Sequence, residues 1–141
     1  MRRRGRHRLA LWVRVALLAT LLAGCAAQRF NSDGMQQFNA GQREQGLVLL
    51  AKATQLEPNN SQYRIDYLNQ QAIVVRDLLA RADAARAAGQ LAGARELYLA
   101  ALRVDGNSEK ARRGVALVDV DERHAIAIAD AERLMKAGNA T

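Results

Sequence analysis

Cysteine, proline and aromatic residues are scarce in this chain of 141 residues. It has one cysteine, Cys25, which excludes a disulfide within the chain, and one proline, Pro58, while aromatic residues make up 4% of the total. Few helix breakers and few β-branched runs, in a sequence rich in alanine, leucine, arginine and glutamine, favour helix throughout. We therefore predict an all-α fold.

Groups that carry chemistry are also scarce. Beyond Cys25 the sequence has a single histidine, His124, with neither a second histidine nor an oriented nucleophile to accompany it. The acidic residues Asp119, Asp121 and Glu122 have the spacing of a solvated helix surface rather than of a calcium loop. No glycine-rich phosphate loop is present. The sequence therefore predicts no enzyme activity, no catalytic or metal-binding residues and no cofactor.

Positive charge is concentrated before Cys25. Six of the 21 Lys and Arg residues precede it and all 14 acids follow it, so the remainder holds fifteen basic residues against fourteen acids. In that remainder opposite charges recur at helical spacing, as in Asp77/Arg81 and Glu132/Lys136. This pattern is typical of solvated helix faces, and no nucleic-acid partner is predicted.

The N-terminal segment has three parts: basic residues 1–8, an apolar stretch from Leu9 to Leu22 interrupted by Arg14, and small residues ending at Cys25. This order is typical of a secretory signal peptide. The uninterrupted part from Val15 to Gly24 has 10 residues, whereas a spanning helix needs about 20. We predict a signal peptide over residues 1–24, with a permanent transmembrane anchor as the alternative.

The stretch "LAGC", Leu22–Cys25, resembles a bacterial lipobox, where lipoprotein signal peptidase cuts before a diacylated cysteine. The resemblance implies cleavage between Gly24 and Cys25, palmitate-type acylation of Cys25, and attachment to the membrane through that residue. Each buried methylene contributes about 0.8 kcal/mol, so two or three acyl chains would hold the chain stably. Alanines rather than an aspartate follow the cysteine, which implies the outer membrane of a Gram-negative bacterium, with the protein facing the periplasm. Residues 25–29 are then the acylated N-terminus and a short tether.

The rest of the chain repeats itself. Ala40–Arg64 aligns with Ala88–Arg112 at a constant offset of 48 residues, and a third copy opens at "AERLMKAGNA", where Gly138 lies 49 residues beyond Gly89. Identities in the first pair include Ala40/Ala88, Gly41/Gly89 and Ala53/Ala101. We expect a repeat region over residues 30–141 whose third copy is truncated, and a natural polypeptide that continues past Thr141.

Each copy resembles a tetratricopeptide repeat of about 34 residues, in which two antiparallel helices pack through small residues. The matching positions are Phe30, Gly34, Gly46, Leu50, Ala53 and Pro58 in the first copy, and Leu78, Ala82, Ala94, Tyr98, Ala101 and Gly106 in the second. The pattern departs where Gln37 and Ala85 replace an aromatic residue. The resemblance implies repeat-packing roles for Gly41, Ala53, Pro58, Gly89 and Ala101.

A period of about 48 leaves room for two long helices, expected over residues 61–88 and 108–137, beside short helices near 30–40, 43–55 and 91–104. "PNNS" and "DGNS" supply the turn and N-cap residues of the long helices. Apolar stripes are predicted on both long helices. They are Leu68, Ala72, Val75, Leu79 and Ala82 on the first, and Ala116, Val120, Ala127, Ala131 and Leu134 on the second.

The tetratricopeptide resemblance also implies a concave binding face on the first helix of each copy. Its candidate partner-binding residues are Asn31, Met35, Phe38 and Asn39 in the first copy and Arg76, Asp83 and Arg86 in the second. Packing under a neighbouring helix is the alternative for Phe38 and Met35.

A lipobox, a repeat almost directly after it, and "LEPNNSQYR" leading into a long helix with "ADAARAAGQ" together resemble the N-terminal extension of outer-membrane secretins of type II secretion and type IV pilus systems. The resemblance implies a protein-binding scaffold in protein secretion or pilus export. Its partners would be other protein subunits of the system, and homo-oligomers are expected if the chain is part of a secretin. The alternatives are a stand-alone tetratricopeptide lipoprotein that assists assembly, as a pilotin does, and the targeting region of a cell-envelope enzyme.

Overall fold

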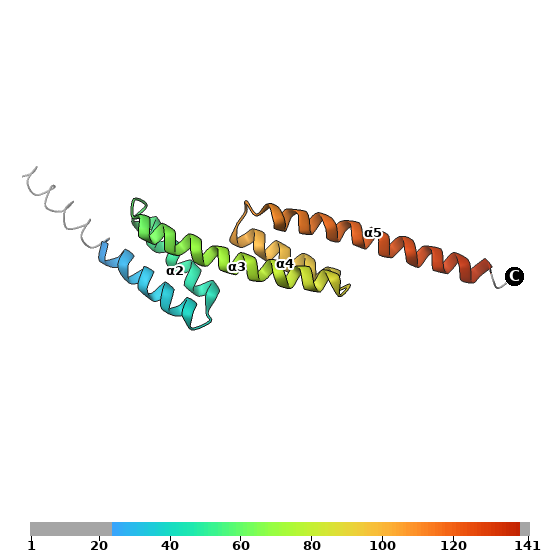
Figure 1. Cartoon of the computed structure of the whole chain (residues 1–141), viewed down its shortest axis with the longest axis horizontal. Helices are drawn as coiled ribbons and strands as arrows, with labels where there is room; N and C mark the ends of the chain where they lie inside the picture. Colours follow the sequence, from blue (N-terminus) through green and yellow to red (C-terminus); the bar gives the residue numbers. More distant parts are fainter. Residues whose placement is uncertain (1–23, 139–141) are drawn as a thin grey trace, which may run out of the picture. The chain divides into compact units, whose positions relative to one another are not determined.

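The computed structural model describes residues 24–138, and within that range every regular element is a helix. The first helix covers residues 24–39. It is followed by α2 (Arg43–Leu56), α3 (Ser61–Ala87), α4 (Leu91–Val104) and α5 (Glu109–Gly138), as Figure 1 shows. The all-α prediction is confirmed, and the expected bounds of these last four helices are met to within one residue. The predicted signal peptide lies outside the described residues except for Gly24.

Residues 25–29 differ from the prediction, because they belong to the first helix instead of forming a separate tether. Alanine has the highest helix propensity, and Ala26 and Ala27 stand in this segment. Ala27 is also fully buried. Helix propensity and packing therefore both extend the helix toward Cys25.

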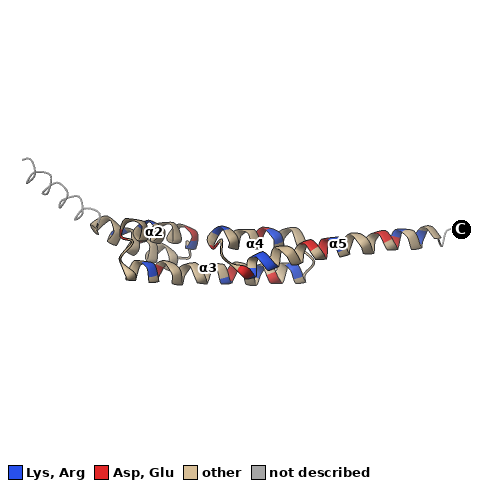
Figure 2. Cartoon of the chain, turned by 90° about the horizontal axis from the view of Figure 1, so that it is seen from above, with Lys and Arg blue, Asp and Glu red and all other residues tan. Residues whose placement is uncertain are grey.

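The chain divides into two compact units at residue 70. The first unit, described from residue 24, contains the first helix, α2 and the start of α3. The second unit contains the rest of α3, α4 and α5. Acidic and basic residues are interspersed along both units in Figure 2, as the sequence predicted.

The turn that ends the first helix recurs at the end of α3. Gln42 N donates to Gln37 O over 2.9 Å, and 48 residues later Gln90 N donates to Ala85 O over the same distance. Gly41 and Gly89 have φ values of 87° and 74°. This left-handed conformation at a helix C-terminus strongly favours glycine. Both glycines are exposed, so they close turns. The expectation that they pack between helices is wrong.

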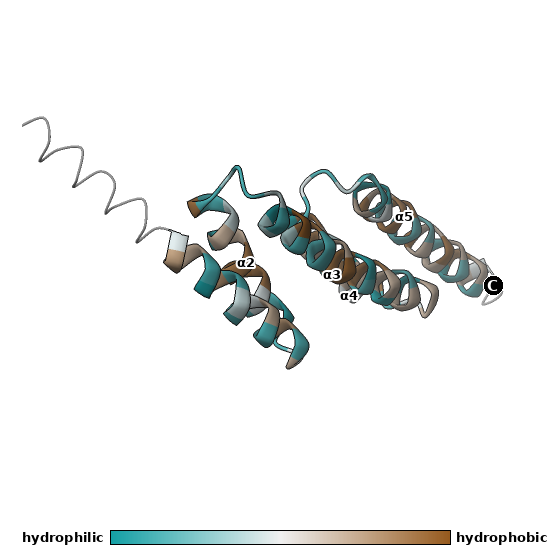
Figure 3. Ribbon diagram, turned by 60° about the vertical axis from the view of Figure 1, so that its left-hand side comes forward, coloured by the Kyte–Doolittle hydropathy of each residue, from teal (hydrophilic) through white to brown (hydrophobic). Residues whose placement is uncertain are grey.

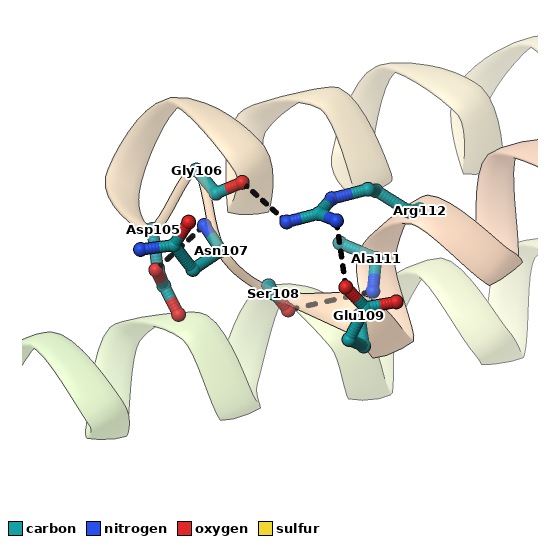
Figure 4. A network of polar contacts seen from close by, with 7 residues as sticks. All are labelled: Asp105, Gly106, Asn107, Ser108, Glu109, Ala111 and Arg112. Carbon is teal, nitrogen blue, oxygen red and sulfur yellow. Dashed lines mark hydrogen bonds and ion pairs between the residues drawn. The ribbon is translucent and has the colours of Figure 1, made fainter.

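The starts of α3 and α5 match in the same way. Asn60 Oδ1 accepts a hydrogen bond from Tyr63 N, and Ser108 Oγ accepts one from Ala111 N, both over 3.4 Å. These are N-cap contacts of the predicted kind. Figure 4 shows the second turn, where Arg112 also donates to Gly106 O.

In the first unit the counterpart of that arginine contact is Arg64 Nη1 donating to Pro58 O over 2.9 Å. Pro58 is exposed and belongs to the turn. The expectation that it packs in the repeat core is therefore wrong. Its carbonyl gives the turn an acceptor, and its lack of an N–H suits a position just past the end of α2.

Corresponding positions of the two copies form the core of each unit. In the first unit a Cβ added at Gly34 would lie 2.9 Å from Leu50 Cγ, and one added at Gly46 would lie 2.8 Å from Gly34 O. Small side chains thus permit close helix approach, as predicted. In the second unit the equivalent residues Ala82, Ala94, Tyr98 and Ala101 are buried in one cluster, and Ala53 is buried in the first.

The predicted stripes on the long helices are only partly buried. On α3, Leu79 and Ala82 are buried and Val75 packs beside them, but Leu68 is 54% exposed and Ala72 is also exposed. Val74 is buried instead.

On α5 the prediction is wrong for Ala116, which is exposed. The buried residues there are Ala111, Gly114 and Val118. Residues 111 and 118 lie on the opposite side of the helix from residues 116 and 120, at about 100° per residue. Periodicity detects an apolar stripe, but it does not say which face the neighbouring helix covers.

Candidate functional site

Cys25, the predicted acylation site, is exposed near the start of the first helix. It borders a surface hollow whose other lining residues are Ala26, Arg29, Phe30 and Asp33. Arg29 forms an ion pair with Asp33 over 3.6 Å, one turn along the helix. Cys25 is therefore accessible, and helix rather than a linker joins it to the rest of the first unit.

The candidate binding residues of the first copy have different surroundings. Asn31 Nδ2 donates to Asp66 Oδ2 over 2.9 Å, which connects the first helix to α3. Phe38 is 8% exposed and packs against Gly46, so it is a core residue and not part of a binding face. The sulfur of Met35 accepts a hydrogen bond from Gln70 Nε2 over 3.7 Å. Of the proposed face, Asn39 is the residue that is exposed.

Asp83 and Arg86, the candidates of the second copy, are engaged within their own unit. Tyr98 Oη donates to Asp83 Oδ1 over 2.5 Å, and Lys110 Nζ lies 3.2 Å from Asp83 Oδ2. Arg86 Nη1 lies 2.8 Å from Asp121 Oδ2. Both candidates therefore connect helices, while Arg76 is exposed.

These contacts shift the pKa values of Asp83, Tyr98 and Arg86. The hydrogen bond from Tyr98 lowers the pKa of Asp83 against the opposing effect of burial, and Lys110 lowers it further. Burial raises the pKa of Tyr98, and its bond to Asp83 acts in the same direction. The hydrogen bond to Asp121 raises the pKa of Arg86. The site therefore holds an ionised carboxylate against a neutral phenol.

Two further features were missed by the sequence reasoning. Arg95 forms ion pairs with Asp119 over 2.6 Å and with Glu122 over 2.7 Å, and these join α4 to α5. The sequence predicted that these acidic residues form only a solvated surface, and this prediction is wrong. A Cβ added at Gly114 would overlap the ring of Tyr98. A glycine in a helix interior often marks such a close approach, and this was the available signal.

Among the described residues, the large apolar side chains with the highest exposed fractions lie at the end of α5. Every residue from 123 to 138, a segment we call the α5 arm, is exposed. Figure 3 shows apolar residues continuing along this helix. Its large exposed side chains are Ile126 at 63%, Ile128 at 60%, Leu134 at 74% and Met135 at 68%. His124 is exposed among them.

Within residues 24–138, no group of three or more His, Cys, Asp or Glu side chains is placed to hold a metal ion. No helix in the same range is both long and apolar enough to cross a membrane.

Comparison with known proteins gives no relative, since neither a protein-family model nor a curated protein matches the chain.

Proposed function

We propose that this chain is a lipid-anchored helical scaffold that binds other proteins at the outer membrane, facing the periplasm. The observation that carries the proposal is the exposed Cys25, which is the last residue of a lipobox-like sequence and lies in the helix that opens the first unit. Two or three acyl chains on this residue would give stable attachment.

The scaffold part of the proposal is supported by the repeat of helical contacts. The turns and small-residue positions of the first unit return 48 residues later in the second, which is typical of helical repeat proteins. Such proteins bind partners along surfaces built from successive repeats. Together with the resemblance in the sequence, this favours the tetratricopeptide class and, within it, the N-terminal region of a secretin.

The anchor is tested by labelling cells of a Gram-negative host with palmitate. We expect label on the wild-type chain and none on Cys25→Ser. Ala26→Asp is the matched control, because it keeps the cysteine and should remain labelled while more of the chain fractionates with the inner membrane. Undiminished labelling of Cys25→Ser would contradict the proposal.

The scaffold role is tested by cross-linking in the native host, followed by identification of the attached proteins. We expect subunits of a secretion or pilus system. Immunoblotting with an antibody against residues 43–60 separates the versions of the proposal. A large, heat-resistant multimer favours a secretin, a small single band favours a stand-alone assembly lipoprotein, and a polypeptide that continues into a catalytic domain favours an envelope enzyme.

A further inference from the structure

We infer that the α5 arm is the opening helix of a third repeat unit and binds a helix of the same chemistry as α4. This inference rests on the proposed scaffold function, because it describes one of the partners that the scaffold would bind. All sixteen residues of the arm are exposed, and four of them are large and apolar.

Three of the four large apolar residues of the arm lie on one face with two alanines, and Ile126 lies outside it. At about 100° per residue, Ala127, Ile128, Ala131, Leu134 and Met135 span about 120° of the helix circumference. The charged residues Asp130, Glu132, Arg133 and Lys136 lie outside this span. The face therefore has the width of a helix stripe that normally packs against a protein core.

The repeat identifies what this face corresponds to. Residues 124–138 align with residues 75–89 at the offset of 49 that joins Gly89 to Gly138. In the second unit the aligned part of α3 contributes five residues to the core, and four of their five counterparts on the arm are apolar. The pairs are Val75/His124, Leu78/Ala127, Leu79/Ile128, Ala82/Ala131 and Ala85/Leu134.

The covering helices of the two complete units share one pattern. In α2 a small residue, a large residue four positions later and a small residue three positions after that are all buried, namely Gly46, Leu50 and Ala53. In α4 the same pattern is Ala94, Tyr98 and Ala101. Each pattern faces a small residue on the opening helix of its unit, Gly34 or Ala82. Ala131 offers the same small residue on the arm.

A polar position on the arm favours the α4 version of this partner. Glu132 aligns with Asp83, whose carboxylate accepts a hydrogen bond from the Tyr98 hydroxyl and forms an ion pair with Lys110. The first unit has Met35 at this position and Leu50 as the large residue, with no carboxylate to bind a hydroxyl. The arm is therefore suited to a helix with alanine, tyrosine and alanine in the α4 spacing.

The experiment uses a fluorescent synthetic peptide with the sequence of residues 88–106 and the mature lipidated chain in phosphatidylcholine nanodiscs. Fluorescence anisotropy should show saturable binding that empty nanodiscs lack. Ala131→Leu should weaken binding about tenfold, because the added side chain overpacks the contact. Ala129→Leu is the matched control, since it adds the same leucine on the other side of the arm, and it should leave the affinity unchanged.

Two readouts identify the site of binding. Hydrogen exchange should slow in residues 123–138 when the peptide is added, and remain unchanged in residues 75–87. A peptide with the Tyr98→Phe change should bind a few-fold more weakly, because Glu132 then loses its donor.

Absence of binding at about millimolar peptide, a concentration at which only very weak association would be missed, would overturn the inference. Equal weakening of binding by Ala131→Leu and Ala129→Leu would also overturn it. So would protection from exchange that is confined to residues 75–87. Palmitate labelling of Cys25 does not depend on the peptide. Loss of peptide binding with labelling intact therefore rejects this inference alone, while loss of labelling rejects the anchor.

Discussion

The two units use the same backbone arrangement to bury different side chains. In the first unit the paired positions are Gly34 and Gly46, which approach so closely that a Cβ added at Gly46 would lie 2.8 Å from Gly34 O, and the larger residue is Leu50, which is fully buried. In the second unit the same positions are Ala82 and Ala94, and the larger residue is Tyr98, which is 1% exposed.

The larger residue in the second unit comes with two matching changes. Gly114 on α5 leaves room for the ring of Tyr98, and Asp83 accepts its hydroxyl. In the first unit the aligned positions are Asp66 and Met35, and Asp66 instead accepts a hydrogen bond from Asn31. A buried hydroxyl needs a partner. Three positions on three helices therefore differ together between the two units.

The largest expected effect comes from truncating the central residue. Tyr98→Ala should lower the free energy of unfolding by about 3–5 kcal/mol and Leu50→Ala by about 2–5 kcal/mol, because each removes a buried side chain and leaves a cavity. Denaturant unfolding followed by circular dichroism measures both. A loss below about 1 kcal/mol for either variant would show that its unit lacks the packed core described.

The glycine contact of the first unit gives the next effect. Gly46→Ala should cost about 1–3 kcal/mol, because its Cβ would lie 2.8 Å from a backbone oxygen that cannot move aside alone. Gly93→Ala is the matched control within α4, since nothing lies within 4 Å of the added atom. It should stabilise the chain by up to about 1 kcal/mol through helix propensity. Stabilisation by both variants would contradict the close approach.

The turns should respond equally in the two units. Gly41→Ala and Gly89→Ala each place a side chain in the left-handed region, at an expected cost of about 1 kcal/mol. Nothing lies within 4 Å of either added Cβ, so the backbone conformation is the whole cause. Thermal unfolding measures both changes. A clear cost in one variant and none in the other would break the equivalence of the turns.

The smallest effect is a pH dependence specific to the second unit. The pKa of Asp83 is lowered in the folded chain, chiefly by Tyr98. The ionised carboxylate therefore stabilises the fold above its ordinary pKa of about 3.9, and this contribution is lost as the pH falls below that value.

Tyr98→Phe removes the main cause of that shift, so its stability should decline less between about pH 5 and pH 3 than that of the wild type. Denaturant midpoints measured across this range test the difference, and Asp83→Asn should flatten the profile in the same way. An unchanged slope in both variants would show that Asp83 does not carry the acid sensitivity.

The bounds of α2, α3, α4 and α5 were predictable because local residues fix them, whereas the first helix begins at residue 24, before its predicted start near residue 30. Gly41 and Gly89 end helices through their backbone conformation, and Asn60 and Ser108 cap the helices that follow. These signals operate within a few residues and do not depend on the tertiary fold.

The buried faces of the long helices were less predictable. Apolar residues such as Leu68 and Leu117 also occur on exposed faces, where they are 54% and 46% exposed. The ion pairs of Arg86 and Arg95 join residues 24–35 positions apart. Which acid each arginine meets depends on how α3 and α4 pack against α5, and helical spacing alone does not determine this.

The central claim is that the two units are followed by a helical segment, residues 123–138, whose apolar residues are exposed in the described part of the chain. Hydrogen–deuterium exchange of the mature chain in nanodiscs, without added peptide, tests it most directly. Exposed helices with few packed contacts exchange quickly, and packed helices exchange slowly. We predict slow exchange in α2 and α4 and fast exchange in residues 123–138. Exchange in residues 123–138 as slow as in α4 would contradict the claim.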